Sequence, residues 1–385
     1  YFQGLQDMMP TAVSQIVEQL VRVVTMIGLA IILLPKGLEY GAAGATLGAA
    51  PGALIAIFVL LWCYWIERKT RKELYLTQNK SIVPDSTFTI LKRLIILAIP
   101  VSLANIMVPI VSSIDLLIVP KRLEVAGFTV EQATTLFGYL TGMATSLINM
   151  PTFVTAAFAA SLVPGISEAN IKKDFDTVRK RTQTAMRLAC IITIPAFVGL
   201  CVIATPISTL LYAIPDAGPC IAVMSLGVFF LGIQQVTTGV LQGLGKTAIP
   251  FINMVASAFI KIGLSWYLTA IPSLGVLGSA WATNADFGIA ALLNLVCLYK
   301  IMEYKMDWIH TGKVFLSSAI MGSAVWFSYK GILQVTHSNT LSSLLSIVLG
   351  GIVFLVAVLI TKTVTAQDVR EMPKVGNQLA NIIEK

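Results

Sequence analysis

Long runs of apolar residues alternate with short polar segments along almost the whole chain. A helix needs about 20 mostly apolar residues to cross the hydrocarbon core of a bilayer. Ten stretches meet this requirement, at roughly residues 11–34, 41–65, 94–120, 134–163, 188–212, 220–241, 248–271, 276–299, 314–332 and 341–361. The pattern predicts an all-α integral membrane protein in which each stretch forms one membrane-spanning helix.

The composition supports this prediction and narrows the class of protein. Charged residues make up only 12% of the 385 residues and hydrophobic residues 56%, whereas a soluble domain carries about 25% charge. These values exclude a soluble enzyme and a disordered chain. The net charge is +8, but the charged residues are too few to form a basic surface along a nucleic-acid backbone. We therefore expect no nucleic-acid partner.

The positive charges gather on one side of the predicted membrane. Alternate connections between the ten stretches carry 21 Lys and Arg residues on one side and 4 on the other. Cytoplasmic loops are enriched in Lys and Arg, so the richer side is expected to face the cytoplasm, together with both ends of the chain. The 2 remaining cations, Arg22 and Lys261, lie near the middle of predicted helices.

Two short motifs indicate an internal repeat. Gln-Gly-Leu occurs at residues 3–5, before the first stretch, and again at 242–244, before the seventh. A Gly-x-x-Gly pair opens the second stretch at residue 41 and the eighth at residue 275. Residues 1–66 therefore look like a copy of residues 239–300 with the same orientation. Such copies predict parallel repeats related by an axis along the membrane normal.

The repeat predicts how the chain is organised. Its second copy ends a six-helix lobe at residues 94–300, and residues 1–66 correspond to the last two helices of a first lobe. Residues 67–93 are expected to form a cytoplasmic loop between the lobes, and residues 301–385 two additional helices and a cytoplasmic tail. We thus expect four further helices to precede residue 1. The alternative, that Tyr-Phe-Gln-Gly at residues 1–4 is the remnant of a cleaved tag, is disfavoured by the recurrence of the motif.

Several motifs resemble one family of membrane proteins. They are Tyr1–Gln6 with Pro10–Ala12, Ser113–Asp115, Pro151-Thr152 with Leu162–Pro164 and Ile166–Ala169, and Thr237–Lys246. In these segments the chain is similar to the stage V sporulation protein B and YtgP/MurJ-like polysaccharide-export family of the multidrug/oligosaccharidyl-lipid/polysaccharide flippase superfamily. The resemblance implies two six-helix lobes plus two helices, 14 in all, in the bacterial plasma membrane. It also implies a monomeric transporter that flips an undecaprenyl-diphosphate oligosaccharide, such as lipid II, by alternating access.

Arg22 and Lys261 are the first candidates for substrate binding. The repeat offset of 239 residues maps one onto the other. A cation at mid-membrane costs at least about 2.5–3.5 kcal/mol, so it should face a bundle interior or a wet cavity. Two such cations would suit the diphosphate of a lipid-linked sugar. The alternative is that each neutralises an acid, as Glu18 would one turn before Arg22. Lys261 has no acid close to it in sequence.

Gln15 and Gln19 extend the polar face that carries Arg22. They are expected either to line a substrate cavity or to hydrogen-bond to other helices. Glu18 could also titrate, because a carboxylate at that depth can carry the coupling proton of a transporter driven by an ion gradient.

Two further acids are candidates for coupling or gating. Asp115 lies toward the outer end of its predicted helix, where it would be either a gate contact or an interfacial charge. Asp286 lies mid-helix, where it could pair with Lys261 of the neighbouring helix as a structural bridge or a gating contact. Mid-helix amides such as Asn253 are expected to bond one helix to another.

The sequence suggests no cofactor. The five cysteines are scattered and the two histidines are far apart, so neither a metal site nor a disulfide is expected. The coupling ion would be a proton or sodium. Two other functions remain open, a multidrug exporter coupled to ions and a membrane-embedded glycan polymerase or ligase. The first would favour an acidic cavity, and the second would need acid–base groups and large outward loops.

Overall fold

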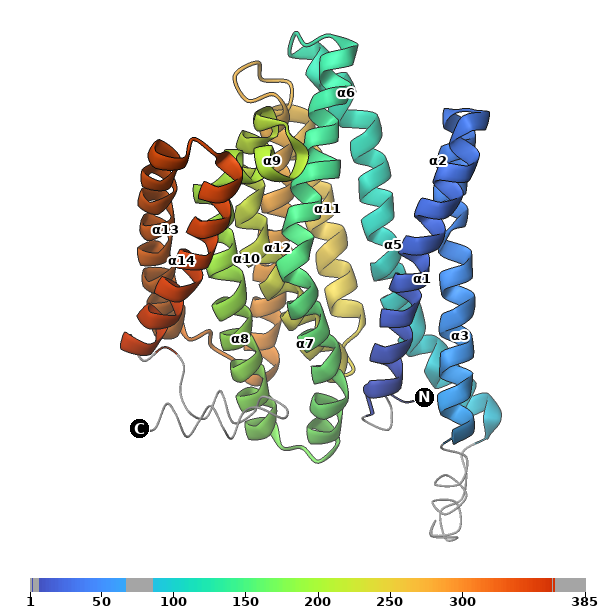
Figure 1. Ribbon diagram of the computed structural model, residues 1–385. Coiled ribbons are helices and arrows are strands. Elements are labelled where there is room, and N and C mark those ends of the chain that lie inside the picture. Colours follow the sequence, from blue (N-terminus) through green and yellow to red (C-terminus); the bar gives the residue numbers. More distant parts are fainter. Residues whose placement is uncertain (1, 3–6, 67–85, 362, 364–385) are drawn as a thin grey trace. The chain divides into compact units, whose positions relative to one another are not determined.

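Figure 1 shows the computed structural model of the chain, which describes residue 2, residues 7–66 and 86–361, and residue 363. Within these residues every regular element is a helix. The chain divides into two units, Tyr1–Leu91 and Lys92–Lys385, and each is described by itself. Most of the predicted inter-lobe loop and nearly all of the predicted tail lie outside the described residues.

The first unit is a helical hairpin. Helix α1 (Met9–Leu33) ends in a short 3-10 turn (Leu34–Lys36), and the chain returns through α2 (Leu38–Leu47) and α3 (Ala49–Ile66). Pro10 lies in the first turn of α1, where the missing amide hydrogen costs nothing. The two arms correspond to the first two predicted stretches.

Four glycines on one face of the returning arm let the two arms approach closely. They are Gly41, Gly44, Gly48 and Gly52. A Cβ atom at Gly48 would lie 2.5 Å from the backbone nitrogen of Met26, so a side chain there would collide with α1. The Thr25 hydroxyl donates to the carbonyl oxygen of Gly48 at 2.6 Å across the same contact. Small residues thus form this helix interface, as is common in membranes.

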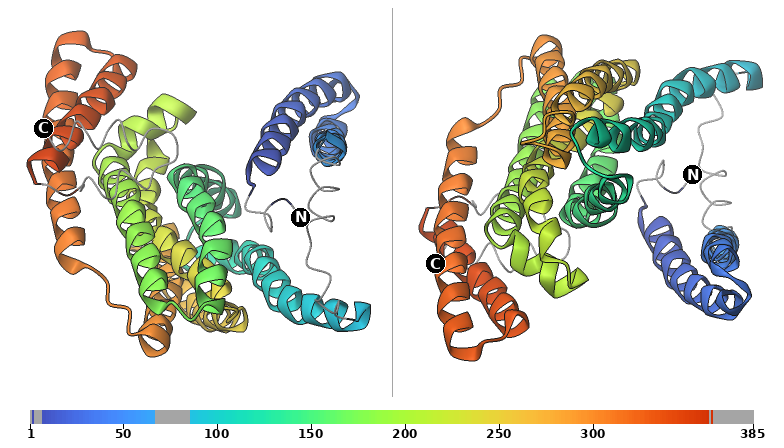
Figure 2. Two further views of the ribbon diagram at one scale, coloured as in Figure 1. Left: turned by 90° about the horizontal axis from the view of Figure 1, so that it is seen from below. Right: turned by 90° about the horizontal axis from the view of Figure 1, so that it is seen from above.

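The second unit is a bundle of helices joined mainly by short turns. In chain order they are α5 (Thr87–Val125), α6 (Val130–Gly138), the π-helix Tyr139–Ala144, α7 (Thr145–Ile171), α8 (Phe175–Val202), α9 (Ala204–Tyr212), the 3-10 turn Pro215–Ala217, α10 (Gly218–Gly243), α11 (Ala248–Leu268), α12 (Val276–Met302), α13 (Trp308–Thr336) and α14 (Asn339–Ile360). Helix α10 lies at the centre and packs against α7, α8 and α12. Helices α13 and α14 pack together at one edge of this unit (Figures 1 and 2).

Side-chain caps set several of these helix starts. Thr129 and Gln132 form a reciprocal capping box at the start of α6. Asp174, Asp307 and Ser338 each accept a hydrogen bond from a backbone amide in the first turn of α8, α13 and α14. Each cap satisfies an amide that would otherwise have no intrahelical partner.

The structure confirms the all-helical membrane architecture and corrects its details. Nine helical segments among the described residues are long and apolar enough to cross a membrane, and they correspond to nine of the ten predicted stretches. The predicted stretch 314–332 lies within α13 but is not one of the nine, because its serines and Lys330 dilute its apolar residues. The predicted stretch 188–212 is interrupted at Ile203, where the backbone leaves helical geometry between α8 and α9.

The glycine face of the first unit gives a stability prediction. Gly48→Ala should destabilise the protein by about 1–3 kcal/mol, because the new methyl group must push α1 away from the returning arm. The matched control is Gly28→Ala in α1, where a Cβ atom would meet nothing within 4 Å and helix propensity favours alanine. Thermal unfolding of the purified protein in detergent measures both. Equal midpoints for the two variants would contradict the close contact.

Candidate functional site

Arg22 and Glu18 form an ion pair on α1. Arg22 Nη2 lies 3.0 Å from Glu18 Oε1, and the two side chains are 36% and 24% exposed. The Nε atom of Arg22 is buried and has no hydrogen-bond partner in the described structure. A Cβ atom at Gly52 would lie 2.9 Å from the Glu18 carbonyl oxygen and 3.2 Å from Arg22 Cβ. The pair therefore lies directly beside the glycine face of α3.

The predicted local pair is thus present, but it does not enclose the arginine. Gln15 and Gln19 are exposed on the same helix, within two turns of Arg22. Together these side chains offer hydrogen-bond donors and acceptors beside a guanidinium whose side chain is 36% exposed. This is the face of the first unit on which an anion would find a donor.

In the second unit a stripe along α5 contains a buried acid. Val111, Asp115, Val119 and Leu123 follow one another at intervals of four residues, and all four are buried. Such spacing places them on one face of the helix. Asp115 therefore lies buried within its unit, and its expected role as a gate contact or an interfacial charge stays a prediction.

Helix α11 presents a polar stripe with the same spacing. Its members are Asn253, Ser257, Lys261 and Ser265, and all four are buried. Asn253 donates to Asn294 of α12 at 2.8 Å, which confirms the expected helix-to-helix role of this amide. Ser265 donates to Ser279 of α12 at 3.3 Å. The stripe is thus the seam between α11 and α12.

Lys261 is paired with an acid that is distant in sequence. Its Nζ atom lies 2.6 Å from Asp115 Oδ2, and the two side chains are only 7% and 12% exposed. The lack of a nearby acid in sequence favours a lysine that is free for substrate, but the structure supplies a partner from 146 residues away. The two stripes of four, at residues 111–123 and 253–265, are the sequence signal that could have indicated this pair.

Asp286 of α12 completes the cluster. Its Oδ1 atom accepts a hydrogen bond from the Ser257 hydroxyl at 2.6 Å. The charges of Lys261 and Asp115 both act on it, yet the lysine forms its ion pair with Asp115. Asp115, Lys261 and Asp286 therefore form one group, the seam cluster, contributed by α5, α11 and α12, in which Asp115 and Lys261 are buried and Asp286 is half-buried. Within the described part of the chain no group of three or more His, Cys, Asp or Glu side chains could hold a metal ion.

A second contact joins α5 to α11 near the seam cluster. The Nε–H of Arg122 donates to the carbonyl oxygen of Trp266 at 2.8 Å. The same guanidinium lies 4.4 Å from the centre of the Trp266 ring, a favourable cation–π geometry. No described side chain of α5 between Thr87 and Ile110 is buried. The C-terminal third of α5 therefore holds this helix to the rest of its unit.

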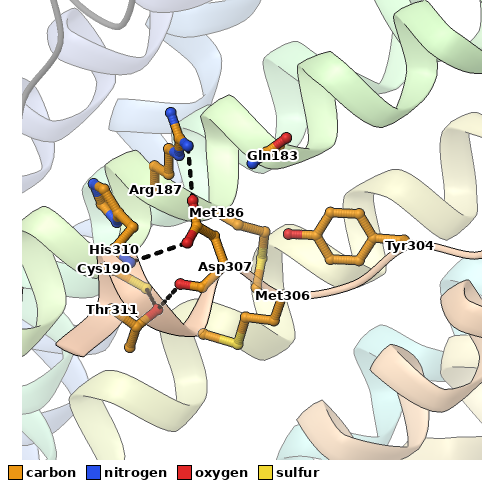
Figure 3. Close-up of a pocket in the computed structure, with 9 residues that line it drawn as sticks. All are labelled: Gln183, Met186, Arg187, Cys190, Tyr304, Met306, Asp307, His310 and Thr311. Atoms are coloured by element: carbon orange, nitrogen blue, oxygen red, sulfur yellow. Dashed lines mark hydrogen bonds and ion pairs between the residues drawn. The ribbon is translucent and has the colours of Figure 1, made fainter.

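A small open cavity of about 180 Å³ lies between α8 and the start of α13 (Figure 3). On its wall Arg187 Nη2 lies 2.7 Å from Asp307 Oδ2. Asp307 also accepts a hydrogen bond from the backbone amide of His310. The amide bond and the guanidinium hold the pKa of Asp307 below its usual value, whereas burial raises the pKa of the Tyr304 hydroxyl. The sequence did not predict a site at these residues, although an Asp directly before a helix is a recognised capping signal.

The seam cluster gives a stability prediction. Lys261→Met should cost about 3–5 kcal/mol, because it leaves buried carboxylates without their cation. Replacing both partners, as in Asp115→Leu with Lys261→Met, should recover most of that loss, since no unpaired charge remains at this contact. The control is Lys172→Gln, which breaks an exposed pair with Glu168 and should cost at most about 1 kcal/mol. Additive losses in the double variant, measured by thermal unfolding, would contradict a coupled pair.

The cavity gives a prediction with a pH dependence. Asp307→Asn should destabilise the protein by about 1–3 kcal/mol at neutral pH, because Arg187 loses its charged partner. A carboxyl with a lowered folded pKa stabilises above its unfolded pKa, whose model value is 3.8, and loses that effect as pH falls through the folded pKa. The difference between variant and parent should therefore shrink below about pH 4. Asp176→Asn, at an 84% exposed side chain, serves as the control, and a difference that persists at pH 3 would argue against this origin.

Comparisons with known proteins agree with this architecture. A family model described as "Lipid II flippase MurJ" matches residues 17–350. Stage V sporulation protein B of Bacillus subtilis (strain 168) is 28% identical over 381 residues, which cover 98% of this chain and 72% of that protein. Lipid II flippase MurJ of the same organism is 27% identical over 340 residues, which cover 84% of this chain and 61% of that protein.

A solved structure shares the fold. It is described as "Lipid II flippase MurJ, inward closed conformation" and matches with a TM-score of 0.62 at 18% sequence identity. The match covers 88% of this chain and 65% of that one. The chain described here thus spans about two thirds of the length of that flippase.

Proposed function

This chain belongs to the lipid II flippase MurJ family, and we propose that it moves a lipid-linked oligosaccharide across the bacterial plasma membrane. The substrate class that we propose is an undecaprenyl-diphosphate sugar, with lipid II as the first candidate. Transport would proceed by alternating access of a central cleft to the two sides, with no chemical change in the substrate. Both described ends of the chain would face the cytoplasm, as the distribution of Lys and Arg indicates.

The observation that carries the proposal beyond family membership is the state of Arg22. Its side chain is 36% exposed, and its Nε atom has no hydrogen-bond partner within the described residues. A partly exposed guanidinium with a donor that is not hydrogen-bonded in this conformation is suited to a planar, bidentate contact with phosphate oxygens once the helix surface around it opens. Gln15 and Gln19 are the proposed neighbours of that anion, and Glu18 is the proposed internal counter-charge.

Lys261 has a different place in the proposal. Its ammonium group is held by Asp115 in the present conformation, so it would reach a substrate anion only in a state in which the two helices have separated. Asp115 is then the proposed gating residue, because its release decides whether Lys261 is available. Asp286 and Glu18 remain the proposed coupling residues for a proton or sodium gradient.

The geometry gives less support to an exporter of cationic drugs. Such a substrate would need a cavity with an excess of negative charge. Among the described residues, Glu18 is paired with Arg22 and Asp115 with Lys261. An anionic substrate therefore matches these paired charges better than a cationic drug does.

A transport assay tests the proposed contact. The full-length protein is reconstituted into vesicles with a fluorescent undecaprenyl-diphosphate oligosaccharide, and the label that becomes accessible to an external reagent is measured over time. Arg22→Gln should slow transport about tenfold or more, because a charge-assisted hydrogen bond contributes about 1.5–3 kcal/mol. Arg22→Lys should retain part of the rate, since it keeps the charge but loses the fork.

Two further variants separate substrate binding from folding. Glu18→Gln removes the internal counter-charge and leaves the guanidinium in place, so it should still bind the substrate. Lys246→Gln removes an exposed cation outside the helices and should transport at the parental rate. Parental transport by Arg22→Gln would refute the proposed contact, and no transport of any lipid-linked sugar by the parent would refute the function.

A further inference from the structure

The seam cluster contains one acid more than its single cation can neutralise. Asp115, Lys261 and Asp286 come from three different helices, and the lysine is only 6% exposed. Lys261 lies 2.6 Å from Asp115, whereas Asp286 receives the neutral hydroxyl of Ser257. If all three groups were charged, the cluster would hold a net negative charge within the membrane. Such an uncompensated charge is disfavoured away from water, and a half-buried carboxyl beside a second acid can take up a proton instead.

The internal repeat shows that the surplus acid belongs to the second unit alone. The offset of 239 residues places Glu18 opposite Ser257 and Arg22 opposite Lys261, and the offset of 234 at the next helix places Gly52 opposite Asp286. The contacts agree with this register, because Gly52 lies against Glu18 and Arg22 as Asp286 lies against Ser257.

The two units therefore neutralise their cations differently. In the first unit the acid lies on the same helix as its cation, so helix movement does not separate them. In the second unit the acid comes from α5, and α12 contributes another acid at the position that glycine occupies in the first unit. Asp286 is thus not required to balance Lys261 while Asp115 is in place.

We propose that Asp286 is a proton-binding site controlled by Lys261. While Lys261 is paired with Asp115, Asp286 holds a proton on a carboxyl oxygen and the cluster is neutral. When α5 withdraws Asp115, the ammonium turns to Asp286, and the proton leaves to water as the new ion pair forms. The cluster is neutral again, and one proton has been released for each separation of α5 from α11. This inference rests on the proposed function, because it assigns the coupling step of the transporter.

The surroundings favour a proton over a metal ion. The helices that pack most extensively against α12 are α10 and α11, and α5 brings Asp115 to the cluster. Helix α10 carries no charged residue, and Lys261 is the only charged residue of α11. The Lys261 ammonium already forms an ion pair with the Asp115 carboxylate, and its charge repels any second cation. A hydroxyl and a single remaining carboxyl are too few oxygens to replace the hydration shell of a metal ion.

Infrared spectroscopy of the full-length protein in detergent tests the site directly. A protonated carboxylic acid has a carbonyl band distinct from the bands of carboxylates. The parent should show a band from a protonated carboxyl at neutral pH, and Asp286→Asn should lose it. Asp115→Asn should also lose the band, because Lys261 is then free to ionise Asp286. Lys261→Met should increase the band, because neither acid of the cluster then has a cation beside it.

Two further variants serve as controls for the infrared measurement. Asp176→Asn, at an 84% exposed side chain, should leave the band unchanged, and Asp286→Glu should shift the band if Asp286→Asn fails to fold. A band that persists in Asp286→Asn, or in Asp115→Asn, would overturn the proposal. A band that sodium chloride removes, and an equal concentration of choline chloride does not, would replace the proton with a metal ion. Because no transport is measured, failure of the flippase assay leaves this result intact, and the two proposals fail separately.

Discussion

The interior of a membrane offers no water to a polar atom, so each charge on a spanning helix must find its partner within the protein. The pair formed by Lys261 and Asp115 is the strongest expression of this constraint in the chain. It joins α5 to α11 with side chains that are almost fully buried. The polar stripe of α11 follows from the same constraint, because each of its members bonds to another helix or to its own backbone.

The two segments predicted to be copies of one repeat pack their helices by opposite means. In the first unit the helices approach through glycines, and the contact is so close that a methyl group at Gly48 would meet the backbone of Met26. In the second unit serine and asparagine side chains form the corresponding seam between α11 and α12. Close packing stabilises a helix contact formed by glycines. Hydrogen bonds stabilise a contact formed by polar side chains, and their geometry depends on the position of each helix. The hydrogen-bonded seam between α11 and α12 is therefore the more sensitive of the two contacts to helix movement.

The sequence was informative wherever the physical cause acts over a short distance. Apolar runs of sufficient length predict the helices, and the spacing of four residues predicts the pair of Glu18 with Arg22. The partner of Lys261 could not be read in this way, because Asp115 lies 146 residues away and the contact depends on how three helices pack. The break at Ile203 was hidden for a related reason, since α8 and α9 form one continuous apolar stretch. The capping role of Asp307 was readable in principle, but its bond to Arg187 was not.

Competition for one ammonium group links the proposed substrate contact to the proposed gate. A diphosphate at Lys261 would displace Asp115 and would leave Asp286 protonated, because the lysine is too deeply buried to serve two anions at once. Displacement of Asp115 breaks one of the two polar contacts described between α5 and α11. The other is the hydrogen bond from Arg122 to the Trp266 carbonyl oxygen. Substrate binding at Lys261 and closure of α5 against α11 then exclude one another. The acid that pairs with Arg22 lies on the same helix, so the state of this pair does not depend on the separation of α5 from α11.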